Sequence, residues 1–116
     1  MIDKKQEQSF KAERVQLRAG TPEQRRMERL RARLRRSLPR WRLAPTRDAI
    51  VRTFRLSGNR STLAFVNLVT ALAAEHGHVP ILDIGASSVT CRLCTPATGG
   101  ISEKDFKLAR QISLLG

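Results

Sequence analysis

The chain has 116 residues and a net charge of +12, and this charge is concentrated near its start. Residues 1–42 hold 14 Lys/Arg against 5 Asp/Glu, whereas residues 43–116 hold 8 against 5 and include most of the apolar side chains. A core this small is near the lower limit for independent stability, so we expect the protein to bury further apolar surface by oligomerisation. No apolar run approaches the ~20 residues that span a bilayer, and the start lacks the apolar segment of a signal peptide. We therefore expect a cytoplasmic protein without a membrane partner.

The first twenty residues are polar and charged and show no helical or strand periodicity. We expect residues 1–20 to form a disordered basic arm that orders when a partner binds. The folded domain is predicted over residues 21–116. It begins with a helix, because Thr21, Pro22 and Gln24 suit the N-cap, N1 and N3 positions of a capping box.

This first helix is predicted to run to about Ser37, because Pro39 stops it. Its apolar residues fall at helical spacing and form one narrow stripe: Met27, Leu30, Leu34 and Leu38. Arginines fill most of the other positions. Guanidinium groups are multidentate donors for carboxylates, so five of them are predicted to contact an acidic partner: Arg25, Arg26, Arg29, Arg33 and Arg36.

The rest of the domain alternates pairs of strands with helices. Strands are expected at residues 41–43, 49–56, 81–84 and 89–93, and helices at 61–75 and 102–112. Ser102 and Asp105 suit the N-cap and N3 positions of the last helix. The predicted order is α-β-β-α-β-β-α. Hairpins separated by helices indicate an α+β fold, with a four-stranded antiparallel sheet and helices packed on one face.

Two cysteines, Cys91 and Cys94, form a C-x-x-C pattern that allows two interpretations. With His76 and His78 they would complete a Cys2His2 metal site. Their flanks read as a strand, however, which places the two thiols on opposite faces and roughly 10 Å apart, too far for a disulfide. We favour two structural cysteines and expect no metal.

A specific motif spans residues 73–112, where A-A-E-H-G-H-V-P is followed by a strand and then by L-C-T-P-A-T-G-G-I-S-E-K-D-F-K-L-A-R-Q-I. The motif resembles the signature of the pterin-4a-carbinolamine dehydratase family. The resemblance covers residues 41–113 and includes Trp41 in the first strand, Pro80, Thr95 and Gly100. It implies the pterin dehydratase-like fold.

The catalytic set implied by this resemblance is incomplete. The family's glutamate position holds Ala74, its first histidine is kept as His78, its second is Val79, and its third is Pro96. Asp105 is kept, where it also suits a helix N-terminus. Proton transfer at neutral pH needs titratable groups, and neither valine nor proline supplies one. We expect no catalytic residues and no cofactor, with His78 and Asp105 as a vestigial pocket. For His78 we favour a packing role or a hydrogen bond to the backbone over ligand binding.

Dehydratase-like chains with a lost site and a basic N-terminal part resemble Rubisco assembly factors that are encoded with alpha-carboxysome genes. This resemblance implies a non-catalytic chaperone whose partner is the Rubisco large subunit or an intermediate of the holoenzyme. It further implies a homodimer in the bacterial cytoplasm, associated with the carboxysome. Two alternatives stay open: a module that binds nucleic acid or a transcription factor, because arginines can follow phosphates, and a weak pterin-4a-carbinolamine dehydratase.

Overall fold

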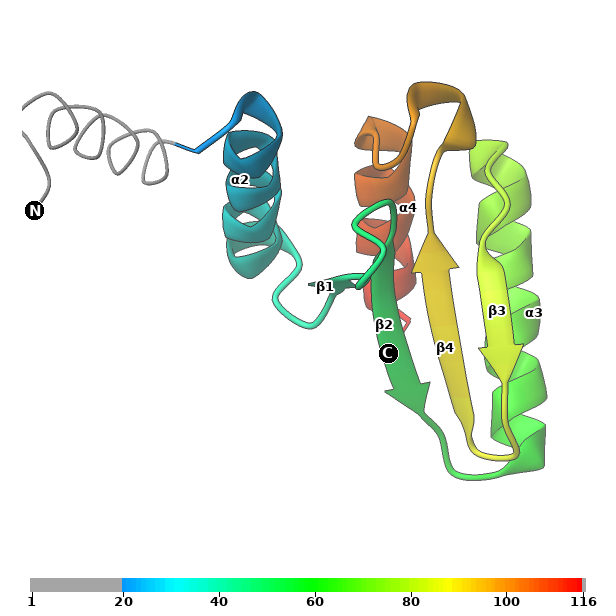
Figure 1. Ribbon diagram of the computed structural model, residues 1–116. Coiled ribbons are helices and arrows are strands. Elements are labelled where there is room, and N and C mark those ends of the chain that lie inside the picture. The colour runs from blue at the N-terminus through cyan, green and yellow to red at the C-terminus, as the bar shows by residue number, and fades with distance from the viewer. Residues whose placement is uncertain (1–19, 116) are drawn as a thin grey trace, which may run out of the picture. The chain divides into compact units, whose positions relative to one another are not determined.

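A four-stranded antiparallel sheet and two helices position the candidate site (Figure 1). The computed structural model describes residues 20–115. These described residues divide into two compact units, residues 20–33 and 34–115. With the labels of Figure 1, the elements are α2 (Pro22–Ser37), β1 (Arg42–Leu43), β2 (Ile50–Arg55), α3 (Asn59–His76), β3 (Ile81–Ile84), β4 (Ser88–Leu93), the short 3₁₀ helix η1 (Pro96–Thr98) and α4 (Glu103–Ser113).

The predicted capping box begins α2. Thr21 Oγ1 accepts a hydrogen bond of 3.1 Å from the backbone N–H of Gln24, and Gln24 Oε1 accepts one of 2.8 Å from the N–H of Thr21. The helix then ends at Ser37, two residues before Pro39. Both predicted boundaries are confirmed. The predicted arm, residues 1–20, lies outside the described residues except for Gly20.

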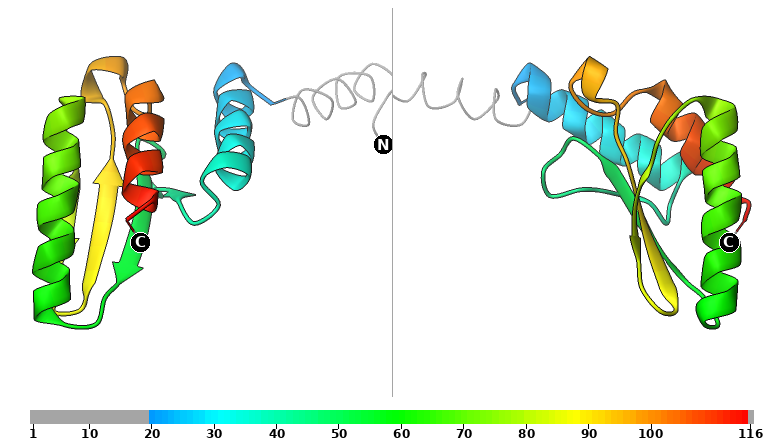
Figure 2. Two further views of the ribbon diagram at one scale, coloured as in Figure 1. Left: turned by 180° about the vertical axis from the view of Figure 1, so that it is seen from behind. Right: turned by 90° about the vertical axis from the view of Figure 1, so that its right-hand side faces the viewer.

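The sheet has the strand order β1-β2-β4-β3, and every neighbouring pair is antiparallel. The predicted element order and α+β class are confirmed. In the central β2–β4 pair, Arg52 lies opposite Cys91 and Phe54 lies opposite Val89. Helices α3 and α4 lie side by side on one face of this sheet (Figure 2).

The main core lies between this face and the two helices. Alternate residues of β2 and β4 point toward the helices, and Phe54 links the layers because its ring centroid is 4.6 Å from that of Phe65 in α3 and 6.3 Å from that of Trp41. The sequence predicted Trp41 inside the first strand. In the structure it lies just before β1. The leucine, isoleucine and valine side chains with no exposed area are Ile50, Val69, Val89, Leu93, Leu108 and Ile112.

The opposite face of the sheet is mostly polar. The hydroxyls of Thr53 and Thr90 hydrogen bond across β2 and β4 at 2.9 Å. A small second cluster of Ala44, Ala49 and Val51 lies here, and Cys94 packs against it. Cys91, which is opposite Arg52 in register, faces the helices instead. The two thiols therefore lie on opposite faces, as predicted, and both are free.

Within residues 20–115, no helix has the length and apolarity that crossing a membrane requires.

Candidate functional site

His78 enters the core because of the way α3 ends. Gly77 adopts a left-handed conformation with φ 59°, and its N–H bonds the carbonyl of Ala74 at 3.2 Å. The N–H of His78 then reaches back to the carbonyl of Ala73 at 3.0 Å. This turn directs the His78 side chain inward, where it is only 9% exposed.

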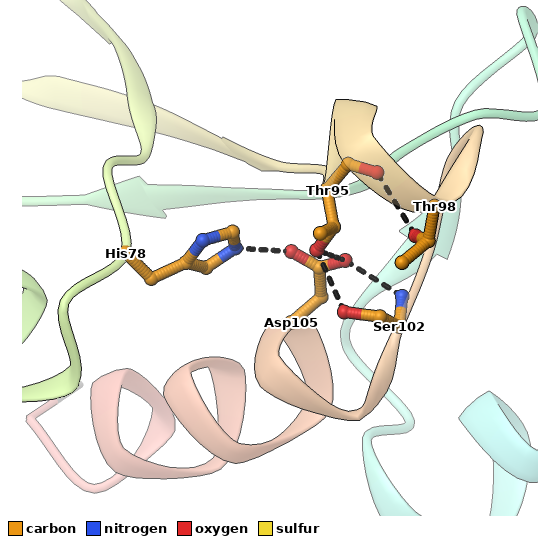
Figure 3. Close-up of polar contacts among 5 residues, drawn as sticks. All are labelled: His78, Thr95, Thr98, Ser102 and Asp105. Atoms are coloured by element: carbon orange, nitrogen blue, oxygen red, sulfur yellow. Dashed lines mark hydrogen bonds and ion pairs between the residues drawn. The ribbon is translucent and has the colours of Figure 1, made fainter.

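Asp105 lies at the start of α4 and is the acceptor at the centre of the site (Figure 3). Its carboxylate is fully buried. Oδ1 accepts a hydrogen bond from His78 Nε2, and Oδ2 accepts one of 2.9 Å from the N–H of Ser102. The second contact belongs to the predicted capping box between Ser102 and Asp105, which is confirmed.

Thr95 completes this group from the end of β4. Its hydroxyl donates to Asp105 Oδ2 at 2.9 Å and therefore accepts the hydroxyl proton of Ser102 at 2.7 Å. Its backbone pairs with Gly100 in a single bridge, through bonds of 2.6 and 3.2 Å. The bridge closes the loop that contains η1. We call His78, Thr95, Ser102 and Asp105 the Asp105 network.

The geometry corrects one expectation about His78. We had favoured packing or a hydrogen bond to the backbone; the side chain is buried, but its hydrogen bond goes to the carboxylate of Asp105 and not to the backbone. An ionised carboxylate only accepts hydrogen bonds, so Nε2 carries the proton in this contact. Nδ1 forms no hydrogen bond with residues 20–115. Every fully buried side-chain nitrogen or oxygen in that range has a hydrogen-bond partner, so Nδ1 must be accessible to solvent. One histidine is thus oriented by an aspartate, as in many acid–base pairs.

The three positions at which the sequence predicted lost catalytic side chains lie at the surface. Ala74, in the last turn of α3, is exposed. Val79 follows His78 and is 84% exposed. Pro96 follows Thr95 as the first residue of η1 and is also exposed. Two of these positions therefore directly follow members of the Asp105 network, and neither can transfer a proton.

The arginines predicted to bind a partner all lie on α2. Arg25, Arg29 and Arg33 recur every four residues and share one face of the helix within the first unit. Arg25 also donates to the carbonyl of Gly20 at 2.7 Å. Arg26 and Arg36 are exposed, and Arg36 belongs to the second unit.

The residues that could hold a metal do not assemble in the described part of the chain. Between residues 20 and 115, no three His, Cys, Asp or Glu side chains are grouped as metal ligands. Burial also raises the pKa of the Cys91 thiol to about 12, which disfavours the thiolate that binds metals.

Comparison with known proteins identifies the family. The profile described as "Pterin 4 alpha carbinolamine dehydratase" matches residues 23–115. The chain belongs to this family. A relative from Xanthomonas campestris pv. campestris, named for the dehydratase, is 40% identical over 78 residues, which are 67% of this chain and 66% of the relative. A relative of the same name from Chloroflexus aggregans is 45% identical over 74 residues, 64% of this chain and 78% of its own length.

Solved structures share the fold. The transcriptional coactivator/pterin dehydratase of Brucella melitensis has a TM-score of 0.66 and 26% identity, over 69% of this chain and 85% of its own. A pterin dehydratase-like protein described as a RuBisCO assembly factor in the alpha-carboxysome has a TM-score of 0.56 and 24% identity. That match covers 65% of this chain and 87% of the other.

Sequence reasoning missed one polar group in the core. Arg52 was expected on a half-buried strand, but it is 7% exposed and lies on the helix-covered face. The available signal was its register, because Arg52 alternates with Ile50 and Phe54, which face the core.

The Asp105 network predicts a large stability loss on removal of its acceptor. Asp105→Ala leaves three donor groups without their acceptor and should lower the free energy of unfolding by about 3 kcal/mol. Asp83→Ala removes an exposed carboxylate from β3 and should change it by less than about 0.5 kcal/mol. Chemical denaturation of both variants measures the difference. Equal losses would show that the buried carboxylate is not a structural centre.

Proposed function

We propose that this protein is a non-catalytic assembly factor for Rubisco, acting on the large subunit or on intermediates of the holoenzyme. The feature that carries the proposal is the presence of Val79 and Pro96, which cannot transfer a proton, directly after His78 and Thr95 of the Asp105 network. A fold kept intact without its full acid–base set fits a binding role. The alpha-carboxysome assembly factor with the same fold gives that role a precedent. The proposed place of action is the bacterial cytoplasm, at the carboxysome.

The surface proposed for recognition is the arginine face of α2, formed by Arg25, Arg29 and Arg33 and extended by Arg26 and Arg36. Only Glu23 and Glu28 offer carboxylates on this helix. Guanidinium groups bind carboxylates through paired hydrogen bonds, so the face suits an acidic partner surface. Single exposed ion pairs contribute only about 0–1 kcal/mol, so several must act together. Such contacts form quickly and release the partner readily.

Charge reversal on α2 tests the assembly role. The triple variant Arg26→Glu, Arg29→Glu, Arg36→Glu should remove partner binding and leave the thermal unfolding midpoint nearly unchanged, because all three side chains are exposed. The readout is the yield of active, assembled Rubisco on co-expression. A matched control reverses Arg42, Arg47 and Arg60, which are exposed outside α2. Equal yields with wild-type protein, the triple variant and no protein would contradict the role.

A nucleic-acid partner is the alternative for the same arginines, and the Brucella structure is named in part as a transcriptional coactivator. Stacking on bases needs accessible aromatic rings. The chain has no tyrosine and one tryptophan, Trp41, which is 3% exposed. We therefore place the protein partner first. Pull-down of the partner with and without nuclease separates the two, because loss of capture after nuclease treatment would favour nucleic acid.

Residual dehydratase activity is the second alternative, favoured by the His78–Asp105 pair and its solvent-facing Nδ1. We expect turnover of a 4a-hydroxytetrahydropterin at least about 100-fold below that of a complete family member, since each positioned acid or base contributes about 10²–10⁴-fold. The double variant Val79→His, Pro96→His should recover part of the rate. His78→Ala is the background control. Turnover at family rates by the unaltered chain would overturn the non-catalytic role.

We also propose a homodimer that pairs through the free edge of β3. Within the described residues β3 pairs only with β4. Ile81 and Ile84 on this strand are 57% and 50% exposed, and Val79, two residues before it, is 84% exposed. An unpaired strand edge with exposed apolar side chains favours pairing with another chain, and lysine on the edge opposes it. Ile81→Lys should raise the dimer dissociation constant at least tenfold in sedimentation, and Leu63→Lys on α3 serves as control. A stable monomer at micromolar concentration would contradict the dimer.

A further inference from the structure

Arg52 is a buried cation on the core-facing side of the sheet. It lies in β2, its side chain is 7% exposed, and its guanidinium carbon is 4.1 Å from the centre of the Phe54 ring. Stacking on the ring stabilises the charge only in part. Charged side chains are almost never buried to this degree unless they are paired.

The described part of the chain supplies little to pair with Arg52. Within residues 20–115 its side chain forms one hydrogen bond, from Nη1 to Ser113 Oγ, at 3.4 Å. That hydroxyl already donates to the carbonyl of Ala109 at 2.7 Å and accepts the indole N–H of Trp41 at 2.8 Å. Among residues 20–115 no carboxylate lies within ion-pair distance of Arg52. Nε and Nη2 thus keep free donors, and neither atom is sealed from solvent.

Arg52 lines an open pocket of about 390 Å³ at the C-terminal end of α4. Two more cations line it, Arg40 and Arg110. Burial, and to a smaller degree the positive charge of Arg40, lowers the pKa of Arg52. An arginine nevertheless stays charged at every physiological pH. The remaining lining is Ser37, Leu38, Pro39, Trp41, Ser113 and Leu114.

The end of α4 does not balance this charge. A helix C-terminus carries the equivalent of about half a negative charge, whereas three arginines line this pocket. The pocket also combines two kinds of surface. The guanidinium fork matches the two oxygens of a carboxylate, while Leu38, Trp41 and Leu114 form apolar walls.

We propose that this pocket binds a carboxylate attached to an apolar group, with Arg52 as its bidentate partner and Arg40 and Arg110 as additional cations. The site is separate from the Asp105 network, which lies at the opposite end of α4. It does not depend on the assembly role. The carboxylate has two sources to be distinguished, a free organic acid and an acidic side chain of a bound protein.

The only tryptophan of the chain reports on this pocket directly. Titration with hexanoate should shift the indole N–H resonance of Trp41 with saturation and should raise the thermal midpoint. Hexanol tests the apolar part alone, and inorganic phosphate tests the charge alone. Each should bind at least tenfold more weakly than hexanoate. If hexanol matches hexanoate, the pocket is merely apolar, and if phosphate does, the carboxylate assignment is wrong.

Matched substitutions locate the effect. Arg52→Met should weaken hexanoate binding at least tenfold, whereas Arg55→Met removes an exposed arginine from the same strand and should leave it unchanged. Arg52→Met removes a buried charge that has no ion-pair partner within residues 20–115. The thermal unfolding midpoint of the unliganded variant should therefore equal or exceed that of the wild-type protein. If Arg52→Met does not fold, Arg110→Met is compared with Lys107→Met, both exposed on α4. Unchanged affinity in Arg52→Met, or in Arg110→Met if that pair is used, would overturn the proposal.

A blocked peptide distinguishes the two sources. Acetyl-Leu-Glu-Leu-amide presents a side-chain carboxylate between apolar residues and has no charged terminus. Binding of this peptide at least as tightly as hexanoate, with the same dependence on Arg52, assigns the site to a protein partner. Tighter binding of hexanoate assigns it to a free acid. If neither shifts the Trp41 resonance at millimolar concentration, the proposal fails.

Discussion

The buried carboxylate of Asp105 holds together three parts of the chain, of which the end of α3 is 27 residues away in sequence. It accepts from His78 after α3, from Thr95 after β4 and from the first turn of its own helix α4. A buried carboxylate is tolerable only when its oxygens are satisfied, and here each of the three elements contributes one donor. The end of α3, the end of β4 and the start of α4 are therefore fixed relative to one another by one side chain.

This constraint gives His78 and Asp105 a structural role that does not depend on catalysis. His78 and Asp105 contribute to the fold whether or not a pterin binds, since they bond each other inside the protein. Val79 and Pro96 occupy exposed positions that no core contact fixes. Residues with a structural role resist replacement, because loss of either partner leaves a buried polar group unpaired. The presence of the His78–Asp105 pair is therefore weak evidence for dehydratase activity. The residues at positions 79 and 96 are more informative about activity.

The sequence predicted the elements well because local rules govern them. Capping boxes at Thr21 and Ser102 and the glycine after α3 mark helix ends through short-range bonds. The partner of His78 could not be predicted, since 27 residues separate it from Asp105 and only the tertiary fold brings them together. The burial of Arg52, in contrast, could have been predicted locally, because alternation places Arg52 on the same face of β2 as the apolar Ile50 and Phe54.

The separation of the two thiols by the sheet gives the protein one chemically addressable position. Cys91 is sealed in the core with a pKa of about 12, so its nucleophilic thiolate is essentially absent at neutral pH. Cys94 is half-buried on the other face, next in sequence to Thr95. A fluorophore or spin label directed at thiols will therefore attach at Cys94 in the native protein without any cysteine being removed, and it will monitor the loop that Thr95 anchors.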